Sequence, residues 1–295
     1  MKIYLNEKRI AVARGTKVAE LAKRHQPEAD LCILNGFPCL WEHTLEEGDR
    51  LVLIKKGRRP SARDLEHLLV ARHTPGVHAK LKKACVGIAG CGGLGSNAAM
   101  ALARVGIGKL VIADFDVVEP SNLNRQYYFI DQIGLPKVKA LAANIKRANP
   151  YVRVEAHYLR VVPENVVSLF GRCQVIIEAF DRADQKEMLA EAVLGRLPGM
   201  PLIIGNGMAG WGGNNLMRTR QLGNLYICGD EATEAGPGRG LMAPRVGLAA
   251  CMQANQALEI VLGPDPALGK FFDGPTELPP HLPYLKRKPK KLKRP

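Results

Sequence analysis

Hydrophobic and polar positions along the chain predict two units of different size. Residues 1–57 show strand patterns at 1–11, 31–34 and 50–54, with a helix pattern that starts near residue 16. Thr16 is the expected N-cap of that helix, and Asn35-Gly36 is the expected hairpin turn. The first 57 residues therefore predict a small ββαββ unit.

Beyond residue 82, buried strand patterns alternate with helix patterns. Strands are expected at 84–89, 110–113, 152–158, 175–180 and 201–205, and helices at 97–105, 164–170, 183–197 and 241–262. Such alternation is typical of a mostly parallel sheet with helices on both faces. We therefore expect a Rossmann-like α/β fold for the larger unit.

Two further segments differ in composition from these units. Residues 58–82 are polar, with a helix pattern at 63–72, and are predicted to link the two units. The last ten residues carry seven Lys or Arg and no acid, so the net charge of +14 is only +7 without them. A basic, proline-containing tail with little to bury predicts disorder rather than a specific nucleic-acid arm. The expected organisation is 1–57, a linker at 58–82, 83–263, and a tail at 264–295.

The bulk composition narrows the class of protein. Hydrophobic residues make up 46% of the chain, but no apolar run approaches the roughly 20 residues that span a bilayer. The N-terminus shows no pattern of a secretion signal. The chain has seven cysteines, an odd number, and their spacing shows no pairs. This pattern argues against a disulfide framework. We therefore expect a cytoplasmic protein with no membrane segment.

A glycine-rich loop follows the first strand of the larger unit. The loop at 90–96 lies between a strand pattern and a small-residue helix pattern, an order typical of nucleotide-binding βαβ units. Backbone amides at such a helix start favour phosphate. Asp114, 19 residues beyond Gly95, ends the next strand and is expected to bind ribose hydroxyls. Asp116 is either a further nucleotide contact or a structural residue.

A second motif argues against a nicotinamide site. Ser121-Asn122-Leu123-Asn124-Arg125-Gln126 is followed by Gly134-Leu135-Pro136-Lys137. A dinucleotide site has no evident need for this pair of cations, whereas a triphosphate that is being cleaved does. We therefore expect Arg125 and Lys137 to neutralise phosphate charge.

These motifs, with Asp181 after a buried strand, resemble the ubiquitin-activating-enzyme-like ThiF/MoeB superfamily. The resemblance covers roughly residues 65–263, and residues 1–57 resemble the β-grasp (ubiquitin-like) carrier ThiS, which favours the ThiF branch. It implies adenylylation of the C-terminal glycine of a sulfur carrier, with ATP and Mg²⁺ bound by a homodimer. The implied ATP-binding residues are Gly90, Gly92, Gly93, Leu94, Gly95, Asp114, Asp116, Asn122, Arg125, Gln126 and Lys137.

The resemblance also implies individual catalytic roles. Arg125 and Lys137 would stabilise the triphosphate, and Asp181 would associate with Mg²⁺, although it could instead cap the helix at 182–197. An arginine of the partner subunit often reaches the triphosphate in this family. Arg72 is the candidate by position, and a solvated linker arginine is the alternative.

Three departures from the family pattern limit which family properties can be expected of this chain. The two Cys-x-x-Cys pairs of many relatives are missing, so no zinc is expected. Cys228 is the one candidate for sulfur chemistry, with an inert buried thiol as the favoured alternative. The β-grasp unit continues through Lys55-Lys56-Gly57 into the linker and has no free Gly-Gly carboxylate. We therefore expect it to be a structural or docking module and not the acyl substrate.

The sequence therefore predicts an ATP-dependent adenylyltransferase that acts on a separate ThiS-like carrier in thiamine thiazole synthesis. Activation of the molybdopterin carrier, as by MoeB, is the alternative within the class. An NAD-dependent oxidoreductase and a non-catalytic scaffold are alternatives from other classes.

Overall fold

The computed structural model describes residues 1–6, 8–57, 62–73 and 76–265. The first part of the chain forms a five-stranded sheet in the order β2-β1-β5-β3-β4. Its strands are β1 (Lys2–Leu5), β2 (Lys8–Ala11), β3 (Leu31–Leu34), β4 (Phe37–Pro38) and β5 (Arg50–Ile54). The helix α1 (Val18–His25) contributes Val18 and Leu21 to a core that includes Ile3, Leu51 and Leu53 of the sheet. The strand and helix patterns of residues 1–57 thus predicted this small sheet, apart from β4.

The small unit differs from expectation at the start of its helix and in one additional strand. Thr16 is not the N-cap of α1, because the helix begins at Val18 and Lys17 holds the cap position without a side-chain bond. The Thr16 hydroxyl instead donates to the Ala13 carbonyl at 2.8 Å. The expected turn at Asn35-Gly36 is confirmed, with φ of 52° and 95°, and it leads into the short additional strand β4.

The segment between the two sheets contains α2 (Ala62–His73) and α3 (Val77–Lys83). The helix predicted at 63–72 is confirmed as α2, whereas α3 was not predicted. Leu81 of α3 is buried in the core of the larger unit. The predicted helix end at Thr74-Pro75 and the predicted tail from residue 266 onward lie outside the described residues.

The large sheet has the order β11-β12-β10-β9-β6-β7-β8. All neighbours are parallel except β11, which pairs antiparallel with β12 at the edge. The expected Rossmann-like, mostly parallel sheet is therefore confirmed. The strands are β6 (Cys85–Ala89), β7 (Lys109–Asp114), β8 (Arg153–Tyr158), β9 (Val175–Glu178), β10 (Leu202–Gly205), β11 (Arg218–Leu222) and β12 (Leu225–Gly229).

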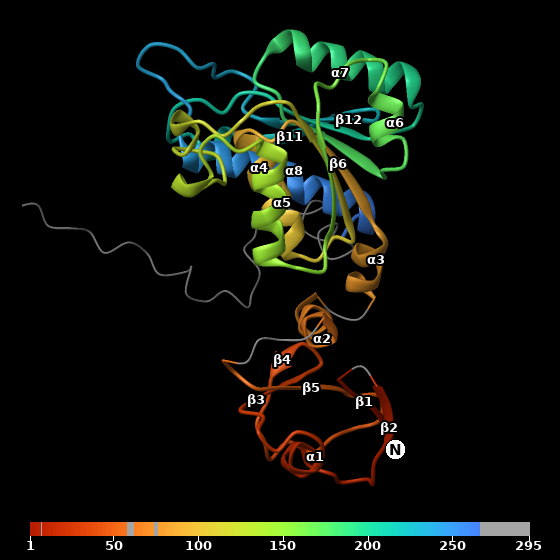
Figure 1. The fold of residues 1–295 in the computed structure, drawn as a ribbon. Coiled ribbons are helices and arrows are strands. Elements are labelled where there is room, and N and C mark those ends of the chain that lie inside the picture. Colours follow the sequence, from red (N-terminus) through yellow and green to blue (C-terminus); the bar gives the residue numbers. More distant parts are fainter. Residues whose placement is uncertain (7, 58–61, 74–75, 266–295) are drawn as a thin grey trace, which may run out of the picture. The chain divides into compact units, whose positions relative to one another are not determined.

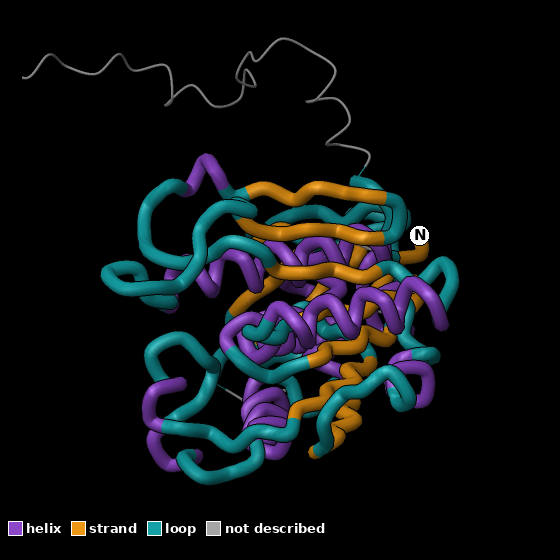
Figure 2. Tube along the Cα trace, turned by 90° about the horizontal axis from the view of Figure 1, so that it is seen from above, coloured by secondary structure: helices purple, strands orange, loops and turns teal. Residues whose placement is uncertain are grey.

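Helices cover both faces of this sheet (Figures 1 and 2). One core packs α4 (Gly93–Arg104), α5 (Lys137–Ala148) and α8 (Ala243–Leu262) against the sheet through residues such as Leu102, Leu141 and Ala250. The opposite core contains Phe170 of α6 (Val166–Phe170) and Leu189 and Val193 of α7 (Ala183–Arg196). Within the described ranges no helix is long and apolar enough to cross a membrane.

The strand order places a topological switch point between β6 and β9. From β6 the chain moves outward to β7 and β8, then returns to β9 on the other side of β6. In open α/β sheets, ligands bind outside the carboxyl ends of the strands at such a point. The glycine loop follows β6 and Asp181 follows β9, so both predicted motifs lie at this edge.

Candidate functional site

The glycine loop turns the chain sharply from β6 into α4. Gly90 has φ of +97°, and a Cβ there would lie 2.7 Å from the Ala179 carbonyl oxygen of the strand-end beside it. A Cβ at Gly95 would collide with the Gly90 carbonyl. Both positions therefore require glycine. The first amides of α4 have no partner within the helix, so they face the switch point as donors for an anion.

The second motif lies directly against this loop. A Cβ placed at Gly93 would lie 3.6 Å from Cγ and 3.7 Å from Cδ of Arg125, and one at Gly92 would lie 3.8 Å from Nε2 of Gln126. The amide of Asn97 on α4 donates to the Arg125 carbonyl at 2.9 Å, which holds the segment in place. The structure thus brings Arg125 and Gln126 to the two central glycines.

Gln126 has an unused acceptor at this position. Its side chain is buried, and its Oε1 atom has no hydrogen-bond partner in the described structure. A buried polar atom without a partner is costly, so it marks a place where a bound group completes the hydrogen bonding. Among the described residues, the Arg125 guanidinium donates to the Asn124 Oδ1 atom at 2.8 Å and to the Ser121 carbonyl at 3.2 Å. The Arg125 guanidinium therefore fits a phosphate beside the loop, and the Gln126 Oε1 atom fits a ligand group that donates, such as a sugar hydroxyl.

Asp114 ends β7 and Asp116 follows it, and the two aspartates have different partners. Asp114 is buried and accepts from the Cys91 amide at 2.5 Å and from the Asp116 amide at 2.7 Å. Burial raises the pKa of Asp114, while these two amide bonds act in the opposite direction. Asp116 accepts from the buried Lys137 ammonium at 2.8 Å. Asp116 is therefore the ion-pair partner of Lys137, which fixes the ammonium at the start of α5.

Two of the expected ATP-binding side chains are occupied elsewhere. Asn122 is buried, and its Oδ1 atom accepts from the Glu119 amide at 3.1 Å within a short 3₁₀ turn. The Leu94 side chain lies in the hydrophobic core against Gly205. Leu94 can therefore offer only its backbone amide to a ligand, and Asn122 mainly shapes the turn before Arg125.

Asp181 lies three residues beyond the end of β9 and is exposed. It is not the N-cap of α7, because that helix begins at Ala183 with Arg182 in the cap position. An exposed carboxylate at this edge fits the single protein ligand that Mg²⁺ commonly takes when it also binds phosphate oxygens. Arg72 belongs to α2, but its side chain lies outside the described part of the structure.

Comparison with protein-family models matches residues 65–291 to the ThiF family and residues 1–57 to the ThiS-like ubiquitin family. The chain belongs to the ThiF family. Both family assignments made from the sequence motifs are confirmed by these matches.

Two curated relatives are similar to this ThiF-family chain over about 70% of its length. The SAMP-activating enzyme E1 of Haloferax volcanii is 32% identical over 209 residues, which cover 68% of this chain and 76% of that protein. The adenylyltransferase and sulfurtransferase MOCS3 of Anopheles gambiae is 30% identical over 223 residues, covering 72% of this chain but 49% of MOCS3. The chain thus spans about half the length of the MOCS3 relative.

Among solved structures, E. coli TcdA, a tRNA N6-threonylcarbamoyladenosine dehydratase crystallised with ATP, resembles the ThiF-family chain. The TM-score is 0.60 at 23% identity, and the match covers 66% of this chain and 92% of TcdA. This likeness agrees with the α/β architecture described above.

Sequence reasoning missed a buried ion pair beside the loop. Glu178, the last residue of β9, is fully buried, and Lys186 of α7 bonds its two carboxylate oxygens at 2.9 and 2.8 Å. The same ammonium reaches the Gly205 carbonyl at the end of β10 at 3.0 Å. Burial raises the pKa of Glu178, against the opposing effect of Lys186. A glutamate closing an otherwise apolar strand was the available signal.

A second missed pair joins Asp230, just after β12, to Arg245 on α8. Both side chains are buried. Arg245 also donates to the Gly212 carbonyl at 2.5 Å, so it ties the start of α8 to the glycine-rich loop after β10. The next residue, Val246, lies 2.8 Å from where a Cβ at Gly93 would be. Arg245 therefore supports the helix that backs the glycine loop.

The cysteine expectations concern residues away from the loop. Cys228 is buried in β12, and burial raises the pKa of its thiol. A buried thiol of this kind is a poor nucleophile. Cys251 is exposed on α8. Among the described residues no group of three or more His, Cys, Asp or Glu is arranged to hold a metal ion, which leaves the zinc expectation untested.

Proposed function

We propose that this protein is an ATP-dependent adenylyltransferase that activates the C-terminal glycine carboxylate of a separate ThiS-type sulfur carrier in thiamine thiazole biosynthesis. The products are the carrier acyl-adenylate and pyrophosphate. The observation that carries the proposal is that the side chains of Arg125 and Gln126 lie close to Gly93 and Gly92. It places a cation and an unused acceptor beside the amides that would bind phosphate.

The chemistry follows from charge and position. The attacking carboxylate and the triphosphate are both anions, so fixed cations must offset the charge that grows on the leaving pyrophosphate. Arg125 is half-buried beside the loop, and Lys137 is held by Asp116 at the start of α5. Asp114 anchors the loop through the Cys91 amide. No side-chain nucleophile is needed, because positioning and charge neutralisation carry the rate.

Mg²⁺ and a homodimer belong to the same proposal. Asp181 would hold Mg²⁺, which supplies charge neutralisation on phosphate oxygens. Arg72 of a partner subunit would add a further cation. The fused β-grasp unit would act as a docking or supporting module, and the cytoplasm remains the expected location.

The names of the relatives support the reaction class. MOCS3 of Anopheles gambiae is an adenylyltransferase and sulfurtransferase, and the Haloferax protein is a SAMP-activating E1. TcdA was crystallised with ATP. None of these names specifies ThiS, so the carrier is the finer part of the proposal.

Pyrophosphate exchange into ATP, with a purified Gly-Gly carrier added, tests the reaction. Arg125→Ala is expected to lower carrier-dependent exchange by about 100-fold or more, as expected for loss of a transition-state charge contact. Arg153→Ala, an exposed arginine on β8 at the other end of the sheet, is the matched control and should leave exchange unchanged. Unchanged exchange in Arg125→Ala would refute the assignment.

Each alternative function predicts a different result in exchange and binding assays on the same purified protein. Exchange with the molybdopterin carrier but not with ThiS would select the MoeB-type reaction. Calorimetric binding of NAD without ATP would select an oxidoreductase. ATP binding without exchange, with activity gained on deleting residues 1–57, would select a scaffold whose small unit blocks its own carrier groove.

A further inference from the structure

Two cysteines meet at the amino ends of the parallel strands, away from the glycine loop. Cys85 is the first residue of β6, and Cys173 lies two residues before β9. Their Sγ atoms are 3.6 Å apart, although 88 positions separate them in the chain. The Gln174 amide donates to the Cys85 carbonyl at 2.9 Å and holds the two segments together. The backbone at the start of two neighbouring strands thus holds the two cysteines together. A small further approach would join the two sulfurs.

The surroundings distinguish the two thiols. Cys85 is partly exposed, whereas Cys173 is buried. The hydrogen bond from Cys173 lowers the pKa of Cys85 to about 7, with burial opposing it and Lys109 assisting. The bond to Cys85 and burial raise the pKa of Cys173. Cys85 is therefore the nucleophile of the pair, because the thiolate is the reactive form.

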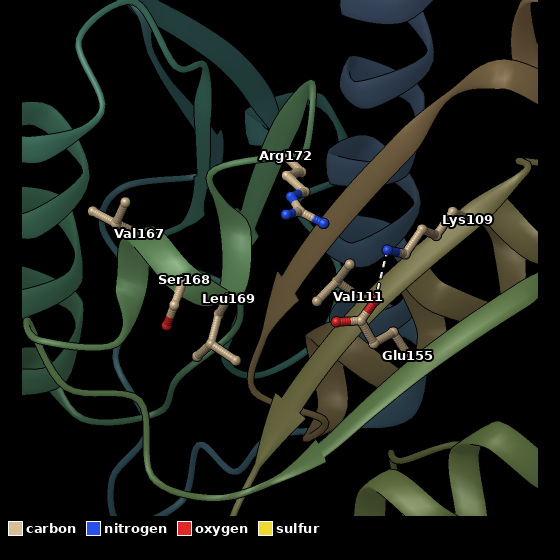
Figure 3. Close-up of a pocket in the computed structure, with 7 residues that line it drawn as sticks. All are labelled: Lys109, Val111, Glu155, Val167, Ser168, Leu169 and Arg172. Atoms are coloured by element: carbon tan, nitrogen blue, oxygen red, sulfur yellow. Dashed lines mark ion pairs between the residues drawn. The ribbon is translucent and has the colours of Figure 1, made fainter.

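Charged groups lie beside Cys85, and a cavity opens over them. Lys109 is the partner of Cys85 in the β6–β7 register, and its ammonium lies 2.6 Å from Glu155 Oε2. His157 contacts the other oxygen of Glu155 at 2.9 Å. A cavity of about 410 Å³ opens over this ion pair, with walls from α6 and the turn after it (Figure 3). Its lining comprises Lys109, Val111, Glu155, Val167, Ser168, Leu169 and Arg172.

No step of the proposed adenylylation uses this cluster. The nucleotide motifs follow the carboxyl ends of β6 and β9, whereas the two cysteines lie at the amino ends of the same strands. A five-residue strand such as β6 separates the two edges by about 16 Å at the usual rise of a strand. The cysteine pair needs its own explanation.

We propose that Cys85 and Cys173 form a reversible modification site, a dithiol that a peroxide oxidises to an intramolecular disulfide. The Cys85 thiolate attacks one peroxide oxygen, so that an S–O bond forms and the O–O bond breaks. The departing hydroxide takes up a proton and becomes water, and Cys85 becomes a sulfenic acid.

The Cys173 sulfur then attacks the sulfenic sulfur. An S–S bond forms, the S–O bond breaks, and the hydroxyl leaves as a second water with the Cys173 proton. The two thiols lose two electrons in total, and the peroxide gains them. A small dithiol reverses the reaction by thiol–disulfide exchange.

The test uses the full-length, reduced protein treated with graded hydrogen peroxide, then alkylated, digested and analysed by mass spectrometry. The expected result is one cross-linked peptide pair containing Cys85 and Cys173, with the free thiols falling from seven to five. Dithiothreitol should restore all seven. Early oxidation of the exposed Cys251, without the Cys85–Cys173 link, would overturn the proposal.

Three variants separate the roles of the two sulfurs. Cys85→Ser should slow thiol loss at this site by about tenfold or more, because a buried protonated thiol reacts slowly. Cys173→Ser should leave a sulfenic acid on Cys85 that dimedone traps. Cys251→Ser is the matched control and should form the disulfide as the native chain does. Dimedone labelling at other cysteines only, in Cys173→Ser, would contradict the assignment of Cys85 as the attacking group.

Discussion

Glu178 ends one strand of the large sheet and Asp230 follows another, and both are buried, yet their surroundings shift their pKa values in opposite directions. Burial dominates at Glu178 and raises its pKa, although Lys186 and the Phe180 amide bond the carboxylate. Burial also tends to raise the pKa of Asp230. The Ala232 and Thr233 amides, the Thr233 hydroxyl and Arg245 outweigh this effect, so the pKa of Asp230 is lowered.

Depth of burial, together with the number and kind of donors around a carboxylate, decides which protonation state the fold favours. Asp230 has two backbone amides, which are fixed by the loop that it closes. Glu178 depends mainly on one long side chain, Lys186. Fixed donors need no ordering of a flexible side chain, so they favour the charged form more reliably.

Removing Lys186, the flexible partner of Glu178, should cause the largest loss of folding stability. Lys186→Met leaves Glu178 buried without its cation, which typically costs about 3–5 kcal/mol. Urea unfolding at neutral pH measures this loss of stability. Arg182→Ala breaks the exposed Arg182–Asp184 pair on the same helix and should change stability by less than about 1 kcal/mol. Equal, small losses in the two variants would show that Lys186 does not stabilise Glu178.

Removing the partner of Asp230 should cost less. Arg245→Met leaves the three other donors to Asp230 in place, so we expect a loss of about 2 kcal/mol. The same unfolding experiment gives the number. A loss larger than that of Lys186→Met would reverse the order of the two sites and contradict the donor argument.

The smallest expected effect is on the pH dependence of stability. Because the pKa of Asp230 is lowered in the folded protein, its ionised form stabilises the fold above the ordinary value of 3.8, and this contribution is lost as the pH falls through the folded pKa. The pKa of Glu178 is raised, so its contribution is present below 4.5 and is lost as the pH rises through the folded pKa.

Melting temperatures between pH 3.5 and 7, about the range in which carboxyl groups titrate, separate the two carboxyls. The advantage of the native chain over Asp230→Asn should shrink as the pH falls. Its advantage over Glu178→Gln should grow as the pH falls. Parallel slopes for the two variants would mean that the surroundings do not distinguish these carboxyls.

Local signals explain what the sequence could predict. The glycine loop, the strand before it and the helix after it are contiguous, so their order identified a nucleotide fold. Arg125 and Gln126 lie together in one motif, and the structure brings that motif to Gly92 and Gly93. The domain limits and the roles of the site residues stay predictions.

Other features depend on residues that are distant in the chain. The β11–β12 hairpin was missed because β11 is exposed along its whole length and shows no alternation of buried positions. Lys186, Arg245 and the Cys85–Cys173 contact arise only when separate strands and helices pack together. Thr16 was misassigned because its hydroxyl bonds backward to Ala13, a choice that composition does not reveal.

The small sheet ends in β5, and the chain continues from there without a free carboxyl end toward α2. Each copy of the large unit is therefore made together with one copy of the small unit, in a ratio that gene expression cannot alter. A partner supplied in this way is never consumed by turnover and never diluted by growth. A ThiS-like unit and a ThiF-family unit are thus covalently joined in this one chain.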